Sequence, residues 1–392
     1  MKKILALTLF LLLLSGNIFS ESSVNVGGHM ALSMFDLAAG TSTYMKDKDS
    51  SAVDYAGFKF LRFMLFIKAS LSEKVLVDIQ PIFETRTDGT TGATQKFPGT
   101  YKDSAMSVII GKQRGLSPKV DFQGFNRATA KMVLGGGTEL SFGYVHPRFT
   151  WDYGNELFWE DELNANPFSL DLYLGNLDAV GFEVVHYFEL ADGNFTIPFY
   201  GYVLNGAGEP GGGSVIENNN SPFGMVHIEP EIGSLKLHLS VGGGVWDEKN
   251  SKLAARAAVG LSFSDGPFSA RAEGAVGYWD SLLYDSKDAA MPFGGYAKCF
   301  YKVSKNLRLS LAGSFDYHNF IMPFQPHAGK EQWIAVSPGL QLTTSPGSRV
   351  VFQLDLAQGI YEPYKNNGVE TYERYDRTIS YVHPTIGWRL TF

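Results

Sequence analysis

The chain contains 392 residues with a formal net charge of −7, and 14% of its residues are aromatic. This mild acidity argues against nucleic acid as a partner, because nucleic-acid-binding domains carry clustered basic charge. Cys299 is the single cysteine, so an intrachain disulfide is excluded. Beyond Ser20, no apolar segment is long and charge-free enough to cross a bilayer as a helix, which excludes a helical membrane protein.

The first residues have the pattern of a secretory signal peptide. Lys2 and Lys3 precede an apolar run over residues 4–14, and small residues follow up to Ser20. A basic start, a short apolar core and a small-residue exit are the parts of such a peptide. We therefore expect residues 1–20 to be a signal peptide and residues 21–392 to form a single transmembrane domain.

Polar and apolar residues then alternate with a period of two in many short segments. In the first half of the chain these segments lie at about 24–35, 56–70, 74–84, 104–112, 126–134, 138–150 and 179–190. In the second half they lie at 235–241, 253–263, 268–276, 293–303, 307–317, 334–343 and 349–360. A period of two places alternate side chains on opposite faces of a sheet, so we expect an all-β chain.

Short turns and long polar connections alternate between these segments. The turns at 264–267 and 345–347 are short, whereas the connections at 205–222 and 361–377 are long. Transmembrane β-barrels show this asymmetry, because their periplasmic turns are short and their extracellular loops are long. The alternation therefore predicts an antiparallel transmembrane β-barrel.

The last strand, Thr378 to Phe392, has one apolar face and ends on an aromatic residue. Trp388, Leu390 and Phe392 lie on that apolar face, which is suited to face lipid. This ending resembles the sorting signal of Gram-negative outer-membrane β-barrels. The resemblance implies the bacterial outer membrane as the location, with its lipid and the barrel-assembly machinery as partners. The alternative is an ordinary edge strand at the end of a soluble sheet.

Counting backward from Phe392, with each short turn in the periplasm, gives about 18 strands. The count requires one weak strand near 94–101 and one long external excursion over 151–178. A 16-stranded barrel is the alternative, because chain length fits both. Barrels of 16 to 18 strands enclose an aqueous channel. By analogy with known porins, the chain is either a monomer or a trimer.

On the face of each strand opposite the apolar row, charged side chains are expected to point into the barrel. The pore-lining candidates are Arg62, Lys131, Arg256, Arg271, Glu273, Lys298, Arg308, Asp316, Arg349, Asp355 and Arg389. Facing charges of opposite sign can form a cross-strand lattice with no selective role. Alternatively, the charges form a transverse field that selects solutes, and a basic excess would favour anions.

The segment 149–166 interleaves aromatic and acidic residues. The candidates for a constriction or for solute contact are Trp151, Tyr153, Glu156, Trp159, Glu160 and Asp161. One interpretation is an aromatic girdle that continues into a solvated acidic loop. Alternatively, the loop folds inward and narrows the pore, as in general porins, and its aromatic rings stack on sugars. Its carboxylates can also hold Ca²⁺, although their spacing matches no defined calcium loop.

Motifs of other functional classes are absent from the sequence. There is no nucleophile elbow, P-loop or metal-ligand cluster, and histidines such as His146, His186 and His227 lie in separate strands. We therefore expect no enzyme activity, no catalytic residue, no cofactor and no metal. The segment 105–114 resembles a strand of alginate-export porins with a Gly-Arg-Gln core, but Lys112 stands where that family has Arg.

The pattern as a whole resembles outer-membrane porins along the entire mature chain. The resemblance implies a water-filled channel for passive diffusion of small hydrophilic solutes. A substrate-selective channel for anions or acidic saccharides is the first alternative. A barrel that forms no channel and acts through its surface loops is the second.

Overall fold

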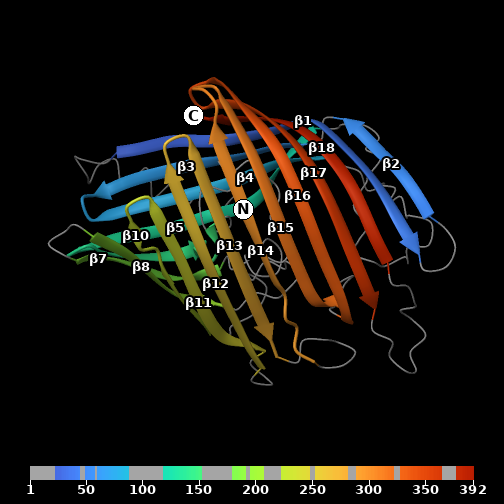
Figure 1. The fold of residues 1–392 in the computed structure, drawn as a ribbon. Coiled ribbons are helices and arrows are strands. Elements are labelled where there is room, and N and C mark those ends of the chain that lie inside the picture. The colour runs from blue at the N-terminus through green and yellow to red at the C-terminus, as the bar shows by residue number, and fades with distance from the viewer. Residues whose placement is uncertain are drawn as a thin grey trace.

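The structure is a computed structural model, and its strands curve round into a barrel (Figure 1). It describes residues 23–44, 49–57, 60–87, 118–151, 179–190, 195–206, 222–247, 252–280, 288–321, 327–363 and 377–392. No helix among these residues is long and apolar enough to cross a membrane.

The strands follow one another along the chain with the numbering of Figure 1. The first nine are β1 (Ser23–Tyr44), β2 (Asp49–Gly57), β3 (Phe60–Ser72), β4 (Val75–Thr87), β5 (Pro118–Gly135), β6 (Thr138–Val145), β7 (Ala179–Leu190), β8 (Phe195–Asn205) and β9 (Pro222–Ile228). The others are β10 (Glu231–Ile232), β11 (Leu235–Asp247), β12 (Lys252–Asp265), β13 (Phe268–Trp279), β14 (Phe293–Lys302), β15 (Leu307–Ile321), β16 (His327–Ser345), β17 (Ser348–Pro363) and β18 (Arg377–Thr391).

Every strand pairs antiparallel with its neighbours, and the pairing of β1 with β18 closes the sheet into a ring. At two places in the ring, two consecutive strands lie end to end and pair with the same neighbouring strand, so together they count as one ring position. Both β2 and β3 pair with β1, and both β9 and β10 pair with β11. The eighteen described strands therefore fill sixteen positions, which is the alternative count that the sequence allowed.

The ring has sixteen positions, whereas the sequence favoured about 18 strands. The difference arises between β4 and β5. These strands pair directly, from Thr87 opposite Pro118 to Val75 opposite Met132, so the ring has no position between them. The expected strand at 126–134 is the second half of the longer β5. The expected strands at 94–101 and 104–112 lie outside the described residues, as does the excursion at 152–178.

Alternation along the strands separates an apolar outer surface from a polar interior. In β12, Leu253, Val259 and Leu261 are exposed, whereas Arg256 between them is only 2% exposed. The strands β9 and β14 show a similar alternation of exposed and buried residues. A barrel in a bilayer requires an apolar outer face and a polar inner face. The structure thus confirms the predicted antiparallel transmembrane β-barrel.

The chain end completes the closure of the ring. The backbone N–H of Phe392 donates to the carbonyl of Gly28 in β1 at 3.0 Å, and the N–H of Gly28 donates back at 2.9 Å. The side chains of Trp388 and Phe392 are exposed on the outer surface, and that of Leu390 is half-buried. The predicted apolar row of the last strand therefore includes two residues that face outward at the seam.

Candidate functional site

Residues 146–151, here called the inner segment, follow β6 and lie against the inside wall of the barrel. Pro147 has no backbone N–H and cannot extend the ladder of β6. Phe149 and Trp151 are buried. The backbone N–H of Trp151 donates to both carboxylate oxygens of Glu273 in β13, at 2.9 and 3.1 Å. The Trp151 Nε1–H donates to Glu229 Oε1 at 3.1 Å. Two carboxylates of the wall therefore hold one tryptophan.

The indole ring of Trp151 is also enclosed by side chains of the wall. The guanidinium of Arg271 lies 5.3 Å from the centre of the indole ring, and the ring of His238 lies 5.2 Å away. On β12, Gly260 leaves the room that the indole fills, because a Cβ at Gly260 would lie 2.8 Å from the ring. The position of the inner segment thus depends on complementary shape as well as on hydrogen bonds.

Two histidines and one glutamate of the wall come together beneath the inner segment. His227 lies in β9, His238 lies in β11, and Glu229 lies between β9 and β10. His227 Nε2 is 3.2 Å from Glu229 Oε1, and His238 Nδ1 is 3.8 Å from the same oxygen. We call these residues the His–Glu–His cluster. All three are buried, so the cluster forms part of the barrel interior.

Arg148 links the cluster to the inner segment electrostatically. Its Nη1 lies 3.8 Å from Glu229 Oε2, and its guanidinium lies 4.8 Å from the centre of the Tyr200 ring. The positive charge of Arg148 favours the ionised form of the Glu229 carboxylate.

Charged side chains elsewhere on the inner face lie against aromatic rings. The Arg256 guanidinium lies 4.9 Å from the centre of the Trp279 ring, and the Lys298 ammonium lies 4.5 Å from that of Tyr296. The Tyr296 hydroxyl donates in turn to Glu273 at 2.8 Å. Cation–π contacts of this kind contribute about 0.5–2 kcal/mol each, depending on solvation. The wall therefore combines fixed positive charges with aromatic surfaces.

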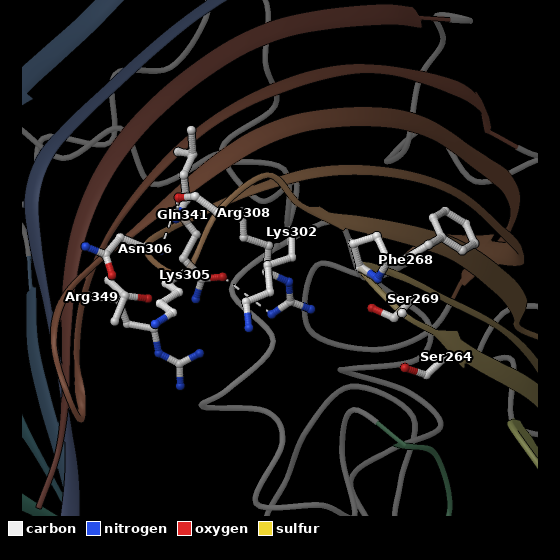
Figure 2. A pocket seen from close by; sticks show the side chains of 14 residues that line it. Ser264, Phe268, Ser269, Lys302, Lys305, Asn306, Arg308, Gln341 and Arg349 are labelled. Carbon is white, nitrogen blue, oxygen red and sulfur yellow. Dashed lines mark hydrogen bonds between the residues drawn. The ribbon is translucent and has the colours of Figure 1, made fainter.

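A cavity of about 320 Å³ lies at the end of the barrel that carries the short turns. Its lining includes four cationic side chains, Lys302, Lys305, Arg308 and Arg349, and no acidic residue. Figure 2 shows these side chains reaching toward the same space from neighbouring strands and turns. Arg308 is held over the Phe300 ring at 3.8 Å and donates to Gln341 at 3.4 Å. We call this cavity the basic pocket.

Solved structures share the overall fold of this chain. An anion-selective porin from Comamonas acidovorans matches 95% of the chain over 100% of its own length, with 14% identity and a TM-score of 0.53. OmpT, an outer membrane protein of Vibrio cholerae, matches 95% of the chain over 98% of its own length, with 10% identity and a TM-score of 0.53. The chain has the fold of outer-membrane porins.

A third porin-fold structure, the outer membrane channel DcaP of Acinetobacter baumannii, matches 95% of the chain over 98% of its own length, with 12% identity and a TM-score of 0.50. No protein-family model and no curated protein sequence matches the chain. The closed barrel, its apolar outer surface and the likeness to outer-membrane proteins together locate the chain in a bacterial outer membrane.

Most of the expected pore-lining residues lie on the inner face of this porin fold, opposite the exposed apolar rows. They are Lys131, Arg256, Arg271, Glu273, Lys298, Arg308, Asp316, Arg349, Asp355 and Arg389. Several have close polar partners, such as Glu139 at 2.6 Å from Lys131 and His318 at 3.1 Å from Asp316. The side chain of Arg62 is outside the described part. Contact of any of these residues with a passing solute stays a prediction.

Among the expected constriction residues, the structure describes Trp151, which lies against the inner wall. The other five, Tyr153, Glu156, Trp159, Glu160 and Asp161, lie outside the described residues. A narrowing of the pore by this segment, and Ca²⁺ binding by its carboxylates, therefore stay predictions.

The His–Glu–His cluster is the feature that sequence analysis missed. The histidines lie in different strands, and their spacing matches no metal motif. The cluster could have been found from the turn at Gly233, because Glu231 pairs with Lys236 and Ile228 pairs with Leu239. This register places Glu229 opposite His238. His227 lies two residues before Glu229, on the same face of the strand.

Proposed function

We propose that this porin-fold chain forms a water-filled channel through which small hydrophilic solutes diffuse across the outer membrane. The observation that supports the proposal is the row of charged side chains on the inner face of a sixteen-position ring, with Arg256, Lys298 and Asp355 as examples. A ring of this size is wider than its own side chains can fill, so water fills the remainder. In this proposal the protein acts as a channel and not as an enzyme.

A preference for anions is the second proposal, and the basic pocket supports it. Four cationic side chains and no carboxylate line this cavity at the end with the short turns. A ring or patch of one sign raises the local concentration of ions of the opposite sign and favours their passage. The likeness in fold to a porin described as anion-selective is consistent with this proposal.

The double variant Lys302→Gln/Lys305→Gln tests the anion preference. In planar bilayers with a KCl gradient, we expect the wild-type reversal potential to indicate chloride preference, and the double variant to shift it toward that of a less anion-selective pore. The effect should be largest near 0.1 M salt, where the screening length is about 10 Å.

The matched control is Lys74→Gln, at an exposed turn between β3 and β4. This variant removes a positive charge at the same end of the barrel but outside the basic pocket, so its reversal potential should stay that of the wild type. A chloride preference that is unchanged in the double variant would refute the role of the pocket and leave the unselective channel as the proposal.

A further inference from the structure

The His–Glu–His cluster has the geometry of a metal site. One potential ligand atom from each of its three residues lies within 4.8 Å of the other two. The side chains of His227 and His238 are 0% exposed, and among the described residues neither His227 Nε2 nor His238 Nδ1 has a hydrogen-bond partner. Both of these nitrogens point to Glu229 Oε1. Buried polar atoms without a partner are rare in native proteins, so they call for a physical explanation.

The outer nitrogens of both rings are held by hydrogen bonds. His238 Nε2 donates to the carbonyl of Phe149 at 2.8 Å, because a carbonyl can only accept. Ser240 Oγ donates to the carbonyl of Arg148 at 3.3 Å, so it accepts from His227 Nδ1 at 2.9 Å. In neutral imidazoles these bonds leave the lone pairs of His227 Nε2 and His238 Nδ1 directed at the carboxylate.

Three acceptor atoms thus converge with no proton between them when both rings are neutral. A cation at their centre would remove this mutual repulsion. Ligands at about 2.0–2.2 Å from a tetrahedral Zn²⁺ lie roughly 3.3 Å from one another. The distances from the two ring nitrogens to Glu229 Oε1, 3.2 Å and 3.8 Å, lie on either side of this spacing. Hydrogen bonds on the far side of each ligand ring are also typical of metal sites.

We propose that His227 Nε2, His238 Nδ1 and a carboxylate oxygen of Glu229 bind one divalent transition-metal ion of the Zn²⁺ class. Two imidazole ligands favour such ions over Ca²⁺ and Mg²⁺, which prefer oxygen ligands throughout. Three protein ligands leave a further position for water or a solute group. Glu229 also lines a cavity of about 400 Å³ that reaches Gly233 and Ser264 near the short turns.

Metal binding would tighten the attachment of the inner segment to the wall. The Phe149 carbonyl is bonded to one ligand ring, and the Trp151 indole N–H is bonded to the ligand carboxylate. Fixing the two rings and the carboxylate around an ion therefore fixes both of these bonds. The proposed metal site does not require the barrel to conduct, because Zn²⁺ binding can be measured on the folded protein in detergent micelles.

The test is a titration of the full mature chain, tag-free and stripped with a chelator, with ZnCl₂ in isothermal calorimetry. We expect one bound Zn²⁺ per chain and no competition from excess Mg²⁺. The variants Glu229→Gln and His238→Ala should each lose at least about 100-fold in affinity, more than the 10- to 100-fold typical of an outer-shell change. Co²⁺ in place of Zn²⁺ should give the visible absorption of a four-coordinate site.

The matched control is His186→Ala, which removes a histidine of β7 that is bonded to Thr138 Oγ1 at 2.8 Å and lies outside the cluster. It should bind Zn²⁺ like the wild type. Zn²⁺ affinities are compared only for variants that are folded. Folding is confirmed when the unboiled form migrates faster in gels than the boiled form. Folded wild-type protein that takes up no Zn²⁺ would overturn the proposal, as would unchanged affinity in folded Glu229→Gln. The cluster would then be a His–Glu ion pair that shares a proton.

Discussion

At the residue scale, small and large side chains of the wall fit one another inside the barrel. Gly260 faces the Trp151 indole so closely that an added Cβ would lie 2.8 Å and 3.0 Å from two ring carbons. An aromatic ring cannot bend away as a flexible chain does, so the whole inner segment would have to move. Gly260 therefore positions Trp151 by leaving room for its ring.

The variant Gly260→Ala tests this fit. We expect the added methyl group to displace Trp151 from the wall toward the lumen, which weakens its bond to Glu229 and lowers the single-channel conductance. The control is Gly243→Ala, because a Cβ there meets only the Ala254 carbonyl, at an ordinary 3.6 Å. Equal conductance in both variants and the wild type would show that Trp151 does not shape the pore.

At the element scale, β18 is both the last strand and one side of the seam. Its backbone pairs with β1 from Thr391 opposite His29 to Arg377 opposite Tyr44, and Phe392 adds two further hydrogen bonds to Gly28. The Phe392 ring itself is 67% exposed on the outer surface. An exposed ring contributes little to the folded barrel, which fits a role in recognition during assembly.

Deletion of Phe392 should impair assembly of the chain into the outer membrane and leave secretion into the periplasm intact. The substitution Phe392→Tyr keeps an aromatic end and should assemble normally. The measurement compares two amounts: heat-modifiable, folded protein in outer-membrane fractions and unfolded protein in the periplasm. Normal assembly of the deleted chain would contradict the sorting role inferred from the sequence.

The sequence pattern predicts the strands but not the His–Glu–His cluster, for physical reasons. Strict alternation indicates which residues of a strand share the inward face, and Arg256 and Asp355, two residues expected on that face, are buried. Alternation does not say which strands are neighbours, and the direct pairing of β4 with β5 changed the count. The His–Glu–His cluster depends on the register of one hairpin, which composition and spacing alone do not provide.

At the scale of the whole molecule, the pairing of β1 with β18 closes the ring and leaves an interior lined by charge. Some opposite charges in that interior are paired, as with Arg127 at 3.1 Å from Glu183, whereas the basic pocket at one end has no acid in its lining. Under the proposed function, this pocket supplies the field that selects anions.

Recording from planar bilayers tests the central claim most directly. Folded protein, verified by strand-rich circular dichroism and heat-modifiable migration, should produce discrete, ohmic conductance steps with a preference for chloride over potassium. A complete absence of conductance from protein that is verifiably folded and inserted would contradict the channel and leave a barrel that acts through its surface loops.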